Sequence, residues 1–78
     1  MNIEQEKLLV KDIIADNLIS LRKKKGVSVS RVQKECFLSA TTLHYIEKKS
    51  NCVSVEVLVR LAIYYDVSVD QILGLKDL

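Results

Sequence analysis

Residues 26–47 read GVSVSRVQKECFLSATTLHYIE, and this stretch decides the fold. It contains two helix starts of one form, in which an apolar residue precedes a serine and another apolar residue follows five positions after the first. The two are Val27-Ser28…Val32 and Leu38-Ser39…Leu43. The serine hydroxyl can accept from a backbone N–H that lacks a partner in the first helical turn, and the apolar pair can pack across the entry. The interval between the serines leaves room for a short helix, a tight turn and a second helix.

Two more starts of the same form follow, at Val53-Ser54…Leu58 and Val67-Ser68…Ile72. The pattern therefore predicts five helices. The first ends in the lysine run before Gly26 and begins either near residue 3, capped by Asn2 and Gln5, or later, capped by Asp12. The others are expected over residues 29–36, residues 40–48, a segment after Ser54, and a short segment from Ser68 to near Gly74, with Ser68 and Gln71 as a capping box.

The same phase predicts which side chains form the core. The residues expected to face inward are Val10, Ile14, Leu18, Leu21, Val29, Val32, Cys36, Leu43, Ile46, Val57, Leu58, Leu61, Ala62 and Tyr65.

Composition indicates one small helical domain. The chain has 78 residues, no proline and an apolar content of 49%, which favours a compact protein over a disordered one. We expect residues 1–12 to form an N-terminal helical extension and residues 13–78 the main domain. The net charge of +2 does not by itself require a nucleic-acid partner. The run from Arg22 to Lys25 is interpreted as a solvated helix end, with phosphate contact as the alternative.

Several function classes are excluded. The chain shows no signal peptide and no apolar run of membrane length, so we expect a cytoplasmic protein without a membrane partner. Its two cysteines predict free thiols, Cys36 buried and Cys52 in a loop. A metal site of Cys36, His44 and Cys52 is rejected because the spacing matches no zinc pattern and no fourth ligand is evident. One histidine and no glycine-rich phosphate loop argue against an enzyme, and no cofactor is expected.

With the helix starts in register, residues 17–75 resemble the phage repressor/Cro-like helix-turn-helix family, the XRE-type transcriptional regulators. The resemblance rests on Leu21-Arg22, Gly26-Val27-Ser28, Leu38-Ser39, Ile46-Glu47 and the run from Tyr65 to Leu73. It implies an all-α, compact five-helix lambda-repressor-like domain that binds double-stranded DNA, with the second and third helices forming the helix-turn-helix.

The resemblance also assigns residues to roles. The third helix would be the recognition helix, with base contacts from Ala40, Thr41, Thr42, His44 and Tyr45. Phosphate contacts would come from Ser28, Ser30, Arg31, Ser39, Lys48, Lys49 and Asn51. Arg22 and Glu47 occupy positions that often form a structural ion pair in the family. His44 as a plain exposed histidine and Tyr45 as a half-buried packing residue are the alternatives.

Four residues depart from the family pattern. Val29 stands where a glutamine commonly opens the second helix, and Gln33 replaces the small alanine that lets the two motif helices pack closely. Phe37 and Lys49 stand where glycines are usual. The turn at Phe37 often needs a positive φ, which is unfavourable for a bulky side chain.

Apolar residues outside the expected core predict a protein interface. Val55, Val59 and Ile63 form a second line on the fourth helix, and Leu75 and Leu78 add apolar surface near the C-terminus. A homodimer through Val59, Ile63, Leu75 and Leu78 would bring two recognition helices to half-sites about 34 Å apart. We therefore expect a sequence-specific regulator, a repressor of bacterial, phage or mobile-element origin. The alternative is a helix-turn-helix-derived interaction module, an anti-repressor or adaptor with weak or lost DNA binding. Either could have a regulatory protein partner.

Overall fold

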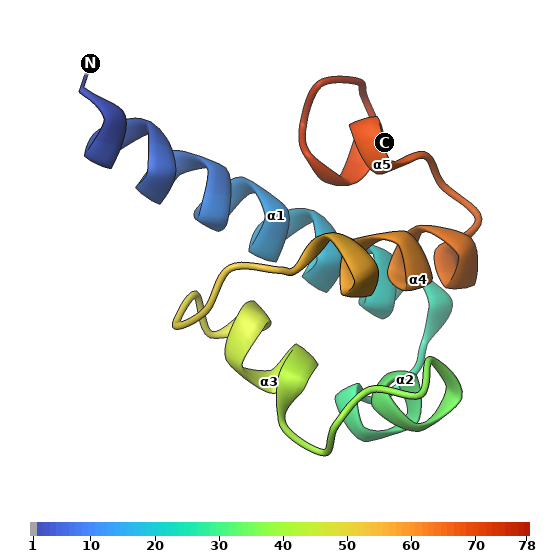
Figure 1. Cartoon of the computed structure of the whole chain (residues 1–78). Coiled ribbons are helices and arrows are strands. Elements are labelled where there is room, and N and C mark those ends of the chain that lie inside the picture. Colours follow the sequence, from blue (N-terminus) through green and yellow to red (C-terminus); the bar gives the residue numbers. More distant parts are fainter. Residues whose placement is uncertain (1) are drawn as a thin grey trace.

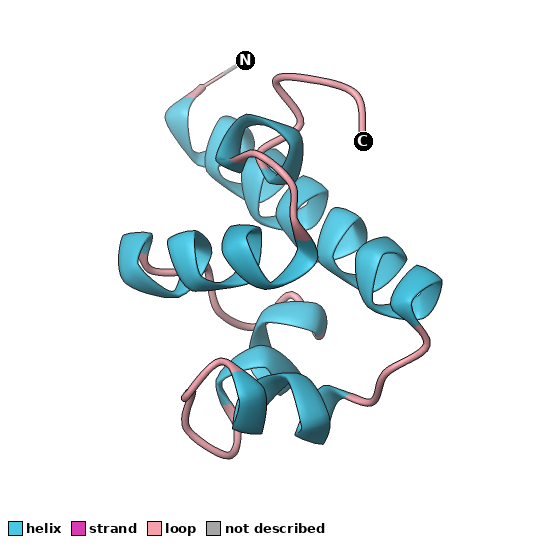
Figure 2. Cartoon of the chain, turned by 90° about the vertical axis from the view of Figure 1, so that its right-hand side faces the viewer, coloured by secondary structure: helices cyan, strands magenta, loops and turns pink. Residues whose placement is uncertain are grey.

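The computed structural model describes residues 2–78, with only the backbone for residues 4–8, so Met1 of the predicted extension lies outside the described residues. The described chain folds into five helices without strands: α1 (Ile3–Lys25), α2 (Val29–Glu35), α3 (Thr42–Glu47), α4 (Val55–Tyr65) and α5 (Val69–Ile72). The predicted all-α class and number of helices are confirmed. α1 runs behind α4, while α2 and α3 lie below α4 and α5 lies above it (Figures 1 and 2).

The core lies where all five helices meet. Its largest fully buried side chains come one from each helix: Leu18 of α1, Val32 of α2, Leu43 of α3, Leu61 of α4 and Ile72 of α5. Burying each of them stabilises the fold by about 1.5–3 kcal/mol. Val10 was expected in this core but is exposed. The N-terminal part of α1 extends past the other helices (Figure 1), so no other helix covers that part of the backbone.

Three of the four predicted serine caps are confirmed. The Ser28 hydroxyl accepts from the Arg31 N–H at 3.1 Å, and the Ser54 hydroxyl accepts from the Val57 N–H at 3.2 Å. At Ser68 the capping box is complete, because its hydroxyl accepts from the Gln71 N–H at 3.1 Å while the Gln71 Oε1 accepts from the Ser68 N–H at 2.9 Å. These helix starts are fixed by residues adjacent in sequence.

The prediction that Ser39 caps the third helix is wrong. α3 begins at Thr42 rather than Ala40, and the residue in the cap position, Thr41, makes no side-chain cap hydrogen bond. The Ser39 hydroxyl instead bonds the Thr42 hydroxyl, and its carbonyl accepts from the Thr42 N–H at 3.4 Å. Residues 40 and 41 form a turn that separates Ser39 from the helix. The side-chain cap of α3 comes instead from another helix, as described below.

α1 begins at Ile3, so the alternative start at Asp12 is wrong. The cap predicted from Asn2 and Gln5 involves a Gln5 side chain that lies outside the described residues. The helix continues unbroken through residues 12 and 13, so the predicted extension and the main domain share one element.

The end of α5 is held against α1. Asn17 Nδ2 donates to the carbonyl of Gln71 at 3.2 Å and to that of Ile72 at 3.0 Å. Gly74 follows with φ 81°, and a Cβ at this position would lie 2.6 Å from the Ile13 Cγ2. Glycine is therefore favoured by the backbone conformation and by the close approach of α1.

Candidate nucleic-acid interface

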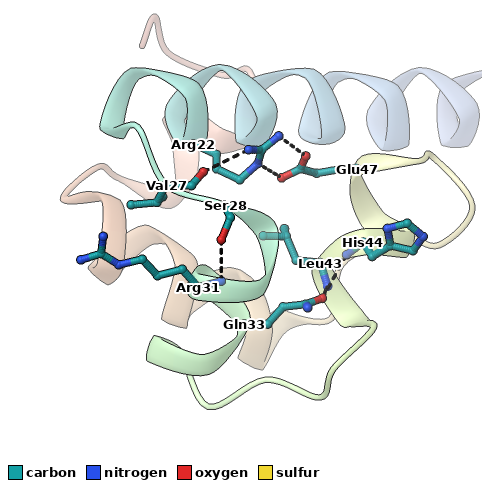
Figure 3. Close-up of polar contacts among 8 residues, drawn as sticks. All are labelled: Arg22, Val27, Ser28, Arg31, Gln33, Leu43, His44 and Glu47. Atoms are coloured by element: carbon teal, nitrogen blue, oxygen red, sulfur yellow. Dashed lines mark hydrogen bonds and ion pairs between the residues drawn. The ribbon is translucent and has the colours of Figure 1, made fainter.

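An ion pair joins the end of α1 to the end of α3. Arg22 Nε lies 2.8 Å from Glu47 Oε2, and Arg22 Nη2 lies 3.1 Å from Glu47 Oε1, so the pair is bidentate (Figure 3). Arg22 Nη1 also donates to the Val27 carbonyl at 3.1 Å, which ties in the entry to α2. The Glu47 side chain is only 9% exposed. The predicted pair is confirmed, and its hydrogen bond raises the pKa of Arg22.

Tyr65 of α4 carries a buried phenol. Its oxygen has no hydrogen-bond partner among the described residues. Burial raises the pKa of Tyr65, and the nearby negative charge of Glu47 raises it further. The phenol therefore stays neutral and contributes apolar packing beside the ion pair.

Gln33 of α2 fixes the start of α3. Its Oε1 accepts from the N–H of Leu43 at 2.8 Å and from the N–H of His44 at 3.1 Å (Figure 3). Its Nε2 donates to the Ala40 carbonyl at 2.8 Å. Gln33 is 4% exposed, and it is the buried polar residue of the described core. The side chain thus supplies, from a neighbouring helix, the cap that α3 lacks locally.

Sequence reasoning treated Gln33 only as a departure from a small residue and missed this role. A signal was present in the pattern. Gln33 follows Val32 on the inward face of α2, and a buried amide needs hydrogen-bond partners. The unpaired N–H groups at the start of the next helix are the nearest such partners, because α2 packs against α3.

The turn between the motif helices has the positive φ that the sequence predicted. Phe37 has φ 57°, and its side chain is 86% exposed. Its N–H donates to the Lys34 carbonyl at 3.3 Å, and the Leu38 N–H donates to the Gln33 carbonyl at 2.8 Å, which closes α2. Arg60 of α4 donates from Nη1 to the Phe37 carbonyl at 2.9 Å. The turn is therefore held by backbone bonds on one side and by α4 on the other.

The side chains assigned to base contact lie on one exposed face of α3. Thr41, His44 and Tyr45 are exposed and recur at helical spacing, opposite the buried Leu43 and Ile46. Thr42 is half-buried, and Ala40 is exposed in the preceding turn. The rings of His44 and Tyr45 meet edge to face, with centroids 5.3 Å apart. Tyr45 thus stands on the surface with its ring supported by a neighbour.

The residues assigned to phosphate contact fall into two groups. Ser28, Ser30, Ser39, Lys48 and Asn51 are exposed. Arg31 and Lys49 already hold carboxylates: Arg31 Nε lies 2.5 Å from Glu35 Oε1, and Lys49 Nζ lies 3.2 Å from Asp16 Oδ1. The charge of these two cations is partly neutralised by the carboxylates, although both keep N–H donors that could contact a phosphate.

The loop after α3 is folded back onto that helix. Lys49, at a position where the family usually has glycine, has φ 65°. The N–H groups of Ser50 and Asn51 both donate to the Tyr45 carbonyl, at 3.0 Å and 3.3 Å. This arrangement places Asn51 beside the exposed face of α3, where it lines a shallow hollow with Thr41, Thr42 and Tyr45.

The sequence model of a helix-turn-helix family matches residues 18–72, which is more than half of the chain. The chain belongs to the helix-turn-helix family. It is a DNA-binding domain of the XRE-type regulators, a family whose members are typically regulatory proteins. The matched range contains the ion pair, the Gln33 cap and all of α3. The comparisons with curated proteins and with solved structures gave no match.

Other kinds of site were sought in the part of the chain that the structure describes. No group of three or more histidine, cysteine or acidic side chains there could hold a metal ion. Cys36 is buried and Cys52 is exposed, both as free thiols, as the sequence predicted. None of the described helices is long and apolar enough to span a membrane.

Proposed function

We propose that the protein is a sequence-specific transcriptional repressor that binds operator DNA in the cytoplasm as a dimer, with α3 in the major groove. A bacterial, phage or mobile-element origin fits this family. The observation that carries the proposal is the double anchoring of α3. Gln33 holds its start and Arg22 holds its end, so the exposed face with Thr41, His44 and Tyr45 is presented in a fixed position. A fixed helix face is what base recognition requires.

Hydroxyl, methyl and aromatic groups would supply base recognition. Thr41 and Tyr45 offer hydroxyls to base edges, and the Ala40 methyl can contact a thymine methyl. No arginine, asparagine or glutamine stands among Ala40, Thr41, Thr42, His44 and Tyr45. Bidentate pairing with guanine or adenine is therefore absent from this face, and we expect part of the selectivity to come from DNA shape.

The phosphate contacts would flank α3 on both sides. Ser28 and Ser30 open α2, while Lys48 and Asn51 follow α3. Each lysine that neutralises a phosphate makes the slope of log affinity against log salt steeper by about 0.9. Lys48→Ala should make the slope shallower by about that amount. Asp16→Asn should strengthen binding, because it releases Lys49 from its carboxylate.

The test is selection of binding sites from random duplex DNA, followed by titrations over a salt series. Thr41→Ala and Tyr45→Ala should each weaken binding to the selected site by about 1–3 kcal/mol per lost base contact while leaving non-specific binding unchanged. Ser20→Ala, an exposed change on α1, is the matched control and should leave both unchanged. Failure to enrich any duplex, with binding that vanishes at moderate salt, would overturn the proposal.

A second candidate function is an interaction module, an anti-repressor or adaptor that works through a regulatory protein partner. The apolar surface favours it, because Ile63, Leu75, Phe37 and Leu78 are all exposed. Large exposed apolar groups mark interaction sites. The two functions separate in the DNA selection, since an adaptor without DNA binding enriches no site. The residues predicted to form a dimer interface fall on two surfaces, Val59 and Ile63 on α4 and Leu75 and Leu78 near the C-terminus, and either function can use one of the two.

A further inference from the structure

Phe37 combines two features that a folded chain ordinarily avoids. Its backbone has φ 57°, a conformation that suits glycine and strains a bulky residue, and its ring is 86% exposed. Neither feature serves the internal packing of the domain. A glycine would hold the turn without strain and without placing an aromatic ring in water. Lys49 and Asp66 also have a positive φ, but of the three only Phe37 exposes a large apolar side chain, and such a side chain is open to a contact outside the chain.

Phe37 stands beside the outer face of α4. Phe37, Cys36 and Glu35 line a hollow together with Arg60, Ile63 and Tyr64 of α4. From Ile63 an apolar line continues along α4 through Val59 to Val55, and we call these three residues the α4 stripe. Val55 is 78% exposed, Val59 43% and Ile63 76%. Phe37 thus extends the stripe at its C-terminal end.

The α4 stripe is self-complementary. Its members are spaced by four residues on either side of Val59, so two antiparallel copies centred on Val59 place each Val55 against the other copy's Ile63. Such mutual contact is the mark of a two-fold interface. Glu56 and Arg60 form an ion pair within α4 and lie beside the stripe. In the antiparallel pair each Glu56 approaches the other copy's Arg60, and the two Arg60 residues also come near each other beside the two-fold axis.

This arrangement also keeps the two reading faces together. In both views α4 lies roughly level and α2 and α3 lie below it (Figures 1 and 2). A two-fold axis along the vertical of those views makes two α4 helices antiparallel. It leaves both helix-turn-helix units on the lower side of the dimer, where one DNA duplex can meet them.

We propose that a second copy of this chain covers this surface, with α4 packed antiparallel on α4 and Phe37 of each copy covering the partner's Val55. This interface would serve the proposed repressor function, and its biological role rests on that function. The contacts themselves require no DNA. The ring of Phe37 becomes buried at the rim of the dimer, which accounts for its retention in a strained turn.

Phe37→Gly separates this role from a role in folding. If the ring serves only the interface, the variant should be more resistant to urea as a monomer, because the strain and the exposed ring are gone. The same variant should dimerise at least tenfold more weakly in sedimentation equilibrium of the full chain. Ile3→Ser, a change at an equally exposed apolar residue on α1, should alter neither property. A wild-type chain that stays monomeric at all concentrations overturns the proposal.

A charge exchange locates the interface. Glu56→Arg and Arg60→Glu each break the ion pair within α4 and bring like charges together across the dimer. Each variant alone should dimerise at least tenfold more weakly than the wild type. When the two variants are mixed, opposite charges meet across the interface, and a heterodimer should form more tightly than either homodimer. The ion pair within α4 is broken in both variants, so only a contact between copies can make the heterodimer tighter than the two homodimers. No gain on mixing would overturn the antiparallel arrangement.

A further variant tests the competing surface near the C-terminus. Leu75→Ser should leave dimerisation unchanged. If Leu75→Ser abolishes dimerisation while Phe37→Gly dimerises as tightly as the wild type, the interface lies at the C-terminal segment and the proposal is overturned. Titration of a single half-site keeps this outcome apart from the DNA function. A chain that binds the half-site but never dimerises refutes the interface alone, whereas one that dimerises but binds no duplex refutes the repressor function alone.

Discussion

Replacing Gln33 with methionine should detach the start of α3 while keeping the volume of the core. Methionine is nearly the same length and fills the space between α2 and α3, so little cavity forms. The three hydrogen bonds to Leu43, His44 and Ala40 are lost, and the Leu43 N–H is left buried without a partner. At about 1 kcal/mol for each bond, we expect the free energy of unfolding to fall by about 2–3 kcal/mol. For a domain of this size, that lowers the melting temperature by at least about 8 °C.

The measurement is urea unfolding followed by circular dichroism, at a concentration where the chain is monomeric, together with amide hydrogen exchange. Lys34→Met is the matched control, because it places the same side chain on the exposed face of the same helix. Its effect should stay within about 0.5 kcal/mol. In Gln33→Met the amides of Leu43 and His44 should exchange faster than in the wild type, by more than the amide of Leu18 in the core does. Unchanged exchange at these two amides, with unchanged stability, would refute the cap.

The remaining predictions concern the ion pair, the glycines and the buried phenol. Arg22→Met should lower the free energy of unfolding by about 3 kcal/mol, because the carboxylate of Glu47 stays largely buried without a cation. In a double-mutant cycle, adding Glu47→Met should recover most of this loss, and additive losses would contradict the pairing. Gly74→Ala should cost more than Gly26→Ala, since both positions have positive φ but only Gly74 has a side chain in the way; equal losses of about 1 kcal/mol would show that strain alone acts. Tyr65→Phe should be neutral or stabilising, because it removes a buried hydroxyl without a partner. The wild type should lose stability as the pH rises above about 10, where the unfolded phenol ionises while the raised pKa of Tyr65 keeps the folded one protonated. This alkaline loss should be smaller in Tyr65→Phe, as measured by urea unfolding across that range.

The sequence predicted those features of the fold that neighbouring residues determine. Ser28, Ser54 and Ser68 cap their helices through N–H groups three residues ahead, so local pattern suffices. Ser39 has the same pattern but does not cap α3, because residues 40 and 41 form a turn and the cap comes from Gln33 of another helix, which accepts from the Leu43 and His44 N–H groups. Local pattern contains no information about a cap that another helix supplies.

The positions of the candidate site residues were predictable from the sequence, but the ion-pair partner of Lys49 was not. The Arg22–Glu47 pair followed from register within the family, and the structure confirms it. The exposure of Thr41, His44 and Tyr45 was implied by the family resemblance, and it agrees with the burial of Leu43 and Ile46 on the opposite side of α3. The pairing of Lys49 with Asp16 joins residues far apart in sequence, so it needed the packing of α3 against α1.

α3 has six residues, far fewer than the roughly 12–15 that an isolated helix needs for even marginal stability in water. Its helical state therefore exists only while α1 and α2 hold it, and in the proposed repressor the DNA-reading form is one member of an equilibrium. The affinity for an operator is then the intrinsic affinity multiplied by the fraction of molecules in which α3 is formed. A substitution such as Gln33→Met lowers that fraction without touching DNA. Residues remote from the bases can in this way set the concentration at which the regulator acts.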